Sequence, residues 1–226
     1  LGGGDDRPAE VAAVERRGLR PLTSHNDWLA QKRLARAEDI AFRSADGTEI
    51  HGFLVKPVDY VAGRRYPTIL RIHGGPVYQF SHEFMPDWQA YAATGFAVVA
   101  TNPRGSSGRG FEFARAIYAD WGNKDVQDVL AGVDHVVALG VADPARLGVG
   151  GRSYGGILTN YVIASDQRFK AAVSGAGASN FIALYGHDMY TREYDIELGF
   201  PWTNRATWDR LSYPFLNADR IATPTL

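Results

Sequence analysis

A serine with a glycine two residues before it and another two residues after it is the residue best placed for chemistry in this sequence. Gly151-Arg152-Ser153-Tyr154-Gly155 matches the pattern G-x-S-x-G, between a short apolar run and a stretch of helical character. A nucleophile that projects from so tight a strand-to-helix turn has a strained backbone, and flanking glycines remove the Cβ atoms that would collide there. We predict that Ser153 is the nucleophile and that Gly151 and Gly155 are its elbow glycines. The alternative is a glycine-rich turn whose serine caps the helix.

Acyl transfer at a serine also needs two hydrogen-bond donors for the oxyanion that develops on the attacked carbonyl. One donor at such an elbow is the backbone N–H that follows the serine, here that of Tyr154. The second is predicted in His73-Gly74-Gly75-Pro76, because its glycines let the backbone approach a substrate after an apolar run. We predict Gly75 as this donor. His73 is expected to hold the loop, since the base of such a site follows the serine in chain order.

A base for Ser153 is harder to assign within these residues. His187 is the only histidine that follows Ser153, but its neighbour Asp188 cannot easily orient the ring nitrogen that faces away from the serine. His187 is therefore expected to line the substrate cleft, with a role as base kept as an alternative. Other carboxylates could serve as its partner, although no motif marks them: Asp195, Asp209 and Asp219.

The remaining polar clusters have simpler interpretations. Arg104-Gly105-Ser106-Ser107-Gly108 lacks the Lys-Ser/Thr of a phosphate loop and is expected to form a structured loop beside the cleft. Asp125 and Asp128 open a helical stretch, where capping and solvation would explain them without catalysis. Since the histidines show no spacing typical of metal ligands, we expect neither a metal site nor a cofactor.

Apolar runs predict the elements that must position these residues. A hairpin is indicated by strands at 40–43 and 49–55 on either side of Asp46-Gly47. Further apolar runs of strand length lie at 67–72, 96–101, 147–150 and 169–174. Helices are predicted at 88–94, 126–137 and 154–164, the second from its valine stripe. Nearly continuous apolar strands that alternate with helices predict an α/β fold: a mostly parallel sheet with helices on both faces.

Composition limits the partners. With 24 Lys and Arg against 25 Asp and Glu and no basic run, the chain lacks the cationic face that nucleic acid requires. No apolar stretch approaches the roughly 18–20 residues of a membrane span, so a membrane is not an expected partner either. The absence of cysteine excludes disulfides, thiolate metal sites and cysteine nucleophiles. It suits a reducing or an oxidising compartment, so the location is unknown and could be cytoplasmic or periplasmic.

Taken in chain order, the motifs resemble the prolyl oligopeptidase family, in particular its acylaminoacyl-peptidase and dipeptidyl-peptidase-like members. The resemblance covers about residues 38–226 in unbroken order. It rests on 42–47 with 52–54, His73-Gly74-Gly75-Pro76, 102–108, Trp121-Gly122 followed by Asp125 and Asp128, 143–148, 151–156 and 221–226. It implies an α/β-hydrolase fold and a serine peptidase that acts on short peptides.

The resemblance also implies how the chain is divided. Residues 1–38 would be the tail of a β-propeller domain and its linker, and residues 39–226 an α/β-hydrolase domain that is incomplete at its C-terminal end. In such enzymes an Asp after a later strand, and then a His, complete the triad. Because 223–226 is similar to the start of that strand, both residues are expected beyond Leu226, and this chain alone is expected to be inactive. The aromatic-rich stretch 181–208 would form a pocket wall, or would only cover the sheet.

Three functions stay open. The resemblance favours a serine peptidase, in which Ser153 attacks a peptide carbonyl and water resolves the acyl-enzyme. A carboxylesterase would use the same elbow and oxyanion hole. A non-catalytic hydrolase-like binding domain would need no base. A peptide is the expected partner, and association into a homo-oligomer is left open.

Overall fold

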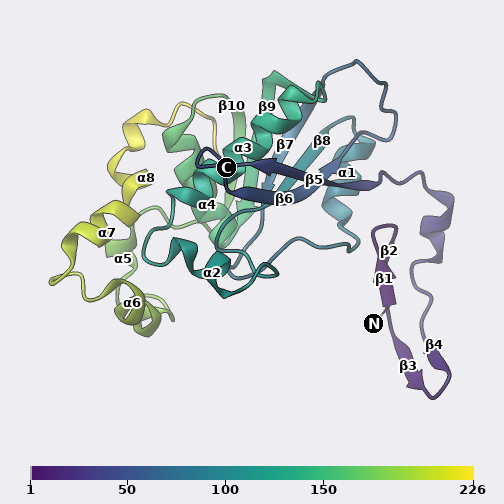
Figure 1. The fold of residues 1–226 in the computed structure, drawn as a ribbon, viewed down its shortest axis with the longest axis horizontal. Helices are drawn as coiled ribbons and strands as arrows, with labels where there is room; N and C mark the ends of the chain where they lie inside the picture. Colours follow the sequence, from purple (N-terminus) through teal and green to yellow (C-terminus); the bar gives the residue numbers. More distant parts are fainter. Residues whose placement is uncertain (1) are drawn as a thin grey trace.

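The structure, a computed structural model, describes residues 2–226 and is built around one six-stranded sheet (Figure 1). The strands lie in the spatial order β10-β9-β7-β8-β6-β5. Strands β10, β9, β7 and β8 are parallel to one another, whereas β6 pairs antiparallel with β8, and β5 antiparallel with β6. Their bounds are β5 (Ala37–Arg43), β6 (Glu49–Val55), β7 (Tyr66–Ile72), β8 (Ala97–Asn102), β9 (Ala142–Arg152) and β10 (Phe169–Gly175).

Helices cover both faces of this sheet. They are α1 (Pro86–Ala93) on one face, and α3 (Lys124–Ala138) and α4 (Tyr154–Ser165) on the other. Side chains alternate along a strand, so Val99 of β8 packs with α3 and α4, while Val98 and Ala100 pack with α1. The predicted mostly parallel sheet with helices on both faces is confirmed.

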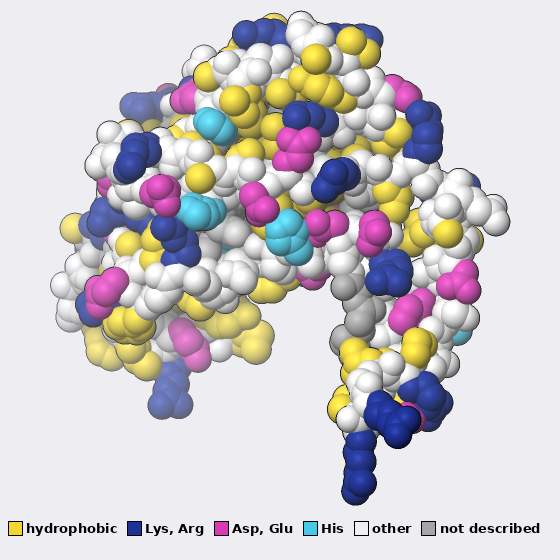
Figure 2. All heavy atoms as spheres, turned by 45° about the vertical axis from the view of Figure 1, so that its right-hand side comes forward, with side chains coloured by type: hydrophobic (Ala, Val, Ile, Leu, Met, Phe, Trp, Pro, Cys, Tyr) yellow, Lys and Arg dark blue, Asp and Glu magenta, His cyan; other side chains and the backbone are white. Residues whose placement is uncertain are grey.

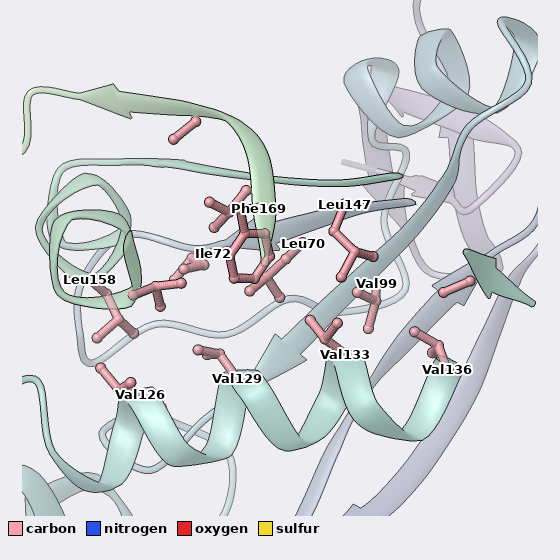
Figure 3. Close-up of a cluster of buried hydrophobic side chains, with 14 of the residues drawn as sticks. Leu70, Ile72, Val99, Val126, Val129, Val133, Val136, Leu147, Leu158 and Phe169 are labelled. Carbon is pink, nitrogen blue, oxygen red and sulfur yellow. The ribbon is translucent and has the colours of Figure 1, made fainter. Parts of the chain in front are cut away.

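The valine stripe of α3 explains how that helix is held. Val126, Val129, Val133 and Val136 recur at three- and four-residue spacing, and each is at most 6% exposed. Figure 3 shows all four pointing from α3 toward the strands, with Val99 of β8 facing them. Burial of one such side chain contributes about 1.5–3 kcal/mol. The stripe therefore fixes α3, and the acidic residues of its first two turns, against the sheet.

Residues 181–220 form a small helical layer beside α4. Its buried side chains make a core of their own, namely Phe181, Tyr194, Leu198, Trp208 and Leu211. Tyr190, Phe200 and Trp202 stay exposed, so not all aromatic side chains of this layer cover the sheet. Its helices are α5 (Phe181–Leu184), α6 (Thr191–Leu198), α7 (Arg205–Leu211), α8 (Tyr213–Leu216) and η3 (Ala218–Arg220); α2 (Phe111–Ala114) and η2 (Arg115–Ile117) precede α3.

The residues before β5 form an arm rather than part of the sheet (Figure 1). They pair in two small antiparallel sheets, β1 with β2 and β3 with β4. Figure 2 shows the arm projecting from the body, with basic side chains at its tip. Its elements are β1 (Gly2–Gly4), β2 (Arg7–Glu10), β3 (Ala12–Glu15), β4 (Gly18–Pro21) and η1 (Asp27–Gln31). Whether the arm is the tail of a propeller stays a prediction.

A few polar contacts, the Arg33–Asp59 ion pair among them, join the arm region to the body. The side-chain amide of Gln89 donates to and accepts from the backbone of Ala35, at 2.9 and 2.8 Å. His82 lies between two carboxylates, 2.7 Å from Asp5 in the arm and 3.2 Å from Asp39 in β5. A cleft of about 990 Å³ lies between the arm and the body. None of its lining residues belongs to the serine elbow, so this cleft is separate from the candidate nucleophile.

Candidate active site

Ser153 lies at the turn between β9 and α4, where its side chain is exposed. Its backbone has φ 60° and ψ −125°, a conformation that is strained for any residue other than glycine. The Ser153 N–H donates to the Gly175 carbonyl of β10 at 2.8 Å, and its own carbonyl accepts from the N–H groups of Gly156 and Ile157. The surrounding backbone therefore holds the strained turn in place. This is the strand–serine–helix geometry that presents a nucleophile.

The elbow glycines lie where a side chain could not fit. A Cβ on Gly151 would come within 2.5 Å of the Ile72 carbonyl oxygen and 2.6 Å of the Gly155 carbonyl. A Cβ on Gly155 would come within 2.3 Å of the same Ile72 oxygen and 2.8 Å of the His73 oxygen. Because all of these neighbours are backbone atoms, they cannot move aside as side chains do. The G-x-S-x-G spacing thus reflects close contact between the elbow and the end of β7.

The glycine-rich loop after β7 runs beside the elbow. Gly74 lies close to the serine, since a Cβ there would be 3.6 Å from the Ser153 Cβ and 3.3 Å from the Arg152 oxygen. Gly75 adopts φ 127°, in the region that favours glycine. Within residues 2–226 neither the Gly75 N–H nor the Tyr154 N–H donates to an acceptor. Two donors without partners therefore lie on the loop and on the helix N-terminus that flank Ser153, the kind of arrangement that can receive an oxyanion.

His73 supports this loop. Its ring is only 4% exposed, with one nitrogen 2.6 Å from the Gly74 carbonyl and the other 2.9 Å from the Ser106 hydroxyl. Burial lowers the pKa of His73, which favours the neutral ring. The hydroxyl of Ser106 in turn lies 2.6 Å from the Pro103 carbonyl. His73 thus ties the glycine loop to residues 103–108, in agreement with the predicted holding role.

Asp125 and Asp128 are not solvated, and that part of the sequence interpretation is wrong. Both side chains are fully buried, at 0% exposure. Asp128 accepts from the Arg104 guanidinium at 2.9 and 2.7 Å and from the Arg104 N–H at 2.8 Å, so it fixes the loop that carries Ser106. Asp125 accepts from the Tyr154 hydroxyl and from the Gly122 N–H. For Asp125 a signal was present in the sequence, since it lies four residues before Val129 of the valine stripe and hence on the same face of the helix.

No histidine of the described chain is hydrogen-bonded to the Ser153 hydroxyl. His187 is exposed, and its side chain makes no hydrogen bond within residues 2–226, so the structure does not bring it to Ser153. The other rings are engaged elsewhere or lie in other parts of the molecule. They are His25 near Glu10, His51 beside Glu49, His73 beside Ser106, His82 beside Asp5 and His135 stacked on Phe42.

The last residues lie beside the same edge of the sheet. Thr225 pairs in parallel with Ala172 of β10, and the Ser174 N–H donates to the Leu226 carbonyl at 2.8 Å. Ser174 directly precedes Gly175, whose carbonyl accepts from the Ser153 N–H. Leu226 and Ser153 are therefore hydrogen-bonded to two consecutive residues of β10.

The described residues contain no cluster of three or more His, Cys, Asp or Glu side chains that could hold a metal ion. Among the helices of residues 2–226, none combines the length and the apolar character needed to cross a membrane.

Comparison with known protein families gives two matches. Residues 82–226 match the Prolyl oligopeptidase family. Residues 19–118 match the acetyl xylan esterase family; this range holds the last part of the arm and strands β5 to β8 of the sheet, but not the serine elbow.

Individual relatives agree with the first match. The chain is 36% identical to the uncharacterized peptidase YuxL of Bacillus subtilis (strain 168), over 98% of this chain and 34% of that protein. It is 32% identical to dipeptidyl-peptidase 5 of Schizosaccharomyces pombe, over 84% of this chain and 28% of that protein. The chain thus spans about a third of the length of these relatives.

A solved structure of an acylaminoacyl peptidase in complex with Z-Gly-Gly-Phe-chloromethyl ketone superposes with a TM-score of 0.89 at 31% identity. The match covers 99% of this chain and 36% of the other. The predicted α/β-hydrolase fold is therefore confirmed. Because the family match spans more than half of the chain and includes the elbow, this chain belongs to the prolyl oligopeptidase family.

Proposed function

We propose that this chain is the nucleophile-bearing part of a serine peptidase and that Ser153 forms an acyl-enzyme with a peptide substrate. The observation that supports this best is the exposed, strained Ser153 at a helix N-terminus, flanked by the unpartnered N–H groups of Tyr154 and Gly75. Membership of a peptidase family favours a peptide over other acyl compounds. The two N–H groups are the proposed oxyanion donors, with Gly74 as the adjacent part of the loop.

The proposed reaction has two steps. In the first, the Ser153 Oγ bonds to the carbonyl carbon of the scissile peptide bond, and the carbonyl oxygen takes the negative charge between the two donors. The serine proton passes to a histidine base and then to the departing amine as the C–N bond breaks. In the second, water loses a proton to the same base and attacks the ester carbon; the base then gives this proton to the Ser153 Oγ as the ester C–O bond breaks and the acid leaves.

The base and its carboxylate are proposed to lie in the part of the longer protein that follows Leu226. Three facts support this placement. No histidine bonds to Ser153 within the described residues, and the chain spans about a third of its relatives. In addition, residues 224–226 pair along β10 toward Gly175, so a chain that continued in this direction would enter the edge of the sheet at which Ser153 lies.

The finer substrate class is proposed from the relatives. One is called a dipeptidyl-peptidase, and another is an acylaminoacyl peptidase with a blocked tripeptide derivative bound. We propose short peptides as substrates, cleaved after an N-terminal dipeptide or after a blocked first residue. Residues 2–38 are proposed to join the hydrolase domain to a β-propeller, in line with their small separate sheets.

A fluorophosphonate probe tests the nucleophile. The complete protein that contains this chain should react with the probe, and Ser153→Ala should abolish both labelling and turnover of a chromogenic dipeptidyl or acylaminoacyl amide. Ser165→Ala, at the other end of α4, is the matched control and should keep both activities. Labelling that persists in Ser153→Ala would rule out the assignment.

A carboxylesterase is the second candidate, because residues 19–118 also match the acetyl xylan esterase family. The elbow and oxyanion donors serve esters and amides alike, so they do not separate the two functions. The same complete protein should be given a peptide amide and an acetyl ester in competition. A higher kcat/KM for the amide supports the peptidase, and a strong preference for the acetyl ester would replace it.

A further inference from the structure

A fully buried carboxylate accepts a hydrogen bond from the side chain of Tyr154, the residue that carries one proposed oxyanion donor, and the proposed reaction does not use this carboxylate. Asp125, in the first turn of α3, is 0% exposed. Its Oδ2 accepts from the Tyr154 hydroxyl and, at 3.1 Å, from the Gly122 N–H, while its Oδ1 accepts from the Val126 N–H at 2.9 Å. Burial raises the pKa of Asp125 to about 6, partly offset by these hydrogen bonds. Burying a charged carboxylate raises the free energy of the folded state unless hydrogen bonds or an opposite charge compensate it.

The partner of this carboxylate is the residue next to the nucleophile. Tyr154 is the first residue of α4, and its backbone N–H is one of the proposed oxyanion donors. Its side chain is 3% exposed and meets the Trp121 ring edge-on, with 5.6 Å between the ring centres. The Tyr154 ring is therefore held by Asp125 at its hydroxyl and by the edge-to-face contact with Trp121. Because the backbone N–H of the same residue is the proposed donor, a shift of the ring would also shift the direction of that N–H.

We propose that Asp125 is a positioning residue: through the Tyr154 hydroxyl it sets the direction of the Tyr154 N–H toward the oxyanion. This inference rests on the proposed function. Ser153 is held in a strained conformation, and such a conformation persists only where neighbouring contacts over-determine it. An oxyanion donor is effective only when it is fixed in advance, because a donor that must first reorient loses much of its effect.

The substitution that separates positioning from plain stability is Tyr154→Phe, which removes a single hydroxyl. In the complete protein we expect kcat to fall about 10-fold, less than the 10²–10³-fold typical of losing a whole oxyanion donor. KM should stay within two-fold, because the donor acts on the transition state. Affinity for a peptide aldehyde, which forms an oxyanion on Ser153, should fall in proportion to kcat/KM.

Tyr161→Phe is the matched control. Tyr161 lies two turns further along α4, is 1% exposed and also donates its hydroxyl to a buried acceptor, the Leu211 carbonyl. Its loss should lower Tm as Tyr154→Phe does, but leave kcat within two-fold. If Tyr154→Phe does not fold, Asp125→Asn combined with Tyr154→Phe removes the charge that would be left unpaired, and the same fall in kcat is expected.

The outcomes are distinguishable. A folded Tyr154→Phe protein, or the folded double variant, with kcat within two-fold of the parent and only a lower Tm would overturn the positioning role. If the parent protein itself shows no Ser153-dependent turnover, the proposed function fails, and the inference fails with it.

Discussion

The serine elbow shows how backbone contact determines residue identity. β9 contains three glycines before Ser153, and their surroundings differ sharply. A Cβ on Gly148 would find its nearest neighbour at 3.7 Å, an ordinary contact, whereas a Cβ on Gly151 would lie 2.5 Å from a backbone oxygen. Neither residue has a positive φ. Gly151 is therefore required because a Cβ has no room there, and not because the backbone needs a conformation that only glycine adopts.

Gly151→Ala should for this reason disable the elbow, and Gly148→Ala should not. Forcing a methyl group against a rigid backbone costs about 1–3 kcal/mol or more. We expect Gly151→Ala to lower the free energy of unfolding by at least that amount and to abolish fluorophosphonate labelling of Ser153. Gly148→Ala should stay within about 0.5 kcal/mol of the parent and keep labelling. Equal labelling of the two variants in the complete protein would contradict this account of the elbow.

At the scale of elements, α3 acts as a support for two loops that meet at the site. One buried acid near its start binds Tyr154 of the elbow, and the other binds Arg104 of the loop at 103–108. That second loop reaches the oxyanion loop through Ser106 and His73. The helix thus fixes both sides of the proposed oxyanion hole while its valine stripe fixes the helix itself.

The Arg104–Asp128 pair should be among the strongest polar contacts of this chain. The two side chains are 6% and 0% exposed, and the guanidinium makes two hydrogen bonds to the carboxylate. Breaking a buried pair by removing one partner typically costs about 3–5 kcal/mol, although Arg104 also pairs with the partly exposed Asp46, which would still compensate part of its charge. Asp128→Ala should therefore lower the free energy of unfolding by about that amount in denaturant titrations.

Asp134→Ala provides the comparison on the same helix. Asp134 pairs with Arg168, but its side chain is 62% exposed, so water and salt screen the pair. We expect a change of about 0–1 kcal/mol. A similar loss for the two alanine variants would mean that burial does not decide the strength of these pairs.

Most elements of the body could be predicted because their signals are local. The alternation of strands, the valine stripe of α3 and the glycine-flanked turn at Ser153 each depend on residues close together in sequence, and the structure has these elements where they were predicted. The role of Ser153 as nucleophile stays a prediction. The role of Asp128 could not be predicted in the same way, because its partner Arg104 lies 24 residues away and only the fold brings them together. A charged residue on a helix is usually solvated, and here a guanidinium on another loop replaced the water.

At the scale of the whole molecule, the arm and the body are joined by few polar contacts, and one of them can titrate. The His82 ring lies edge-on to Phe53, at 5.0 Å between centres, with the Asp5 and Asp39 carboxylates on its two nitrogens. Asp5 belongs to the arm and Asp39 to the edge strand of the sheet. A protonated His82 can donate to both carboxylates at once, whereas a neutral ring can donate to only one.

Attachment of the arm should therefore weaken as the pH rises. The hydrogen bond to Asp5, with the charges of Asp5 and Asp39, raises the pKa of His82 above its usual value near 6.5. A raised pKa in the folded state means that the stabilisation is fully present below about pH 6.5 and is lost as the pH rises through the folded-state pKa. We expect hydrogen exchange of residues 2–10 in the complete protein, corrected for the intrinsic effect of pH, to accelerate across that range.

His82→Gln should remove this pH dependence, while His51→Gln should leave it intact, because His51 bonds to Glu49, two residues away within β6. Exchange of residues 2–10 that follows the same pH curve in the parent and in His82→Gln would show that the arm is held by its other contacts, such as the Gln89–Ala35 pair, and that the histidine has no part in it.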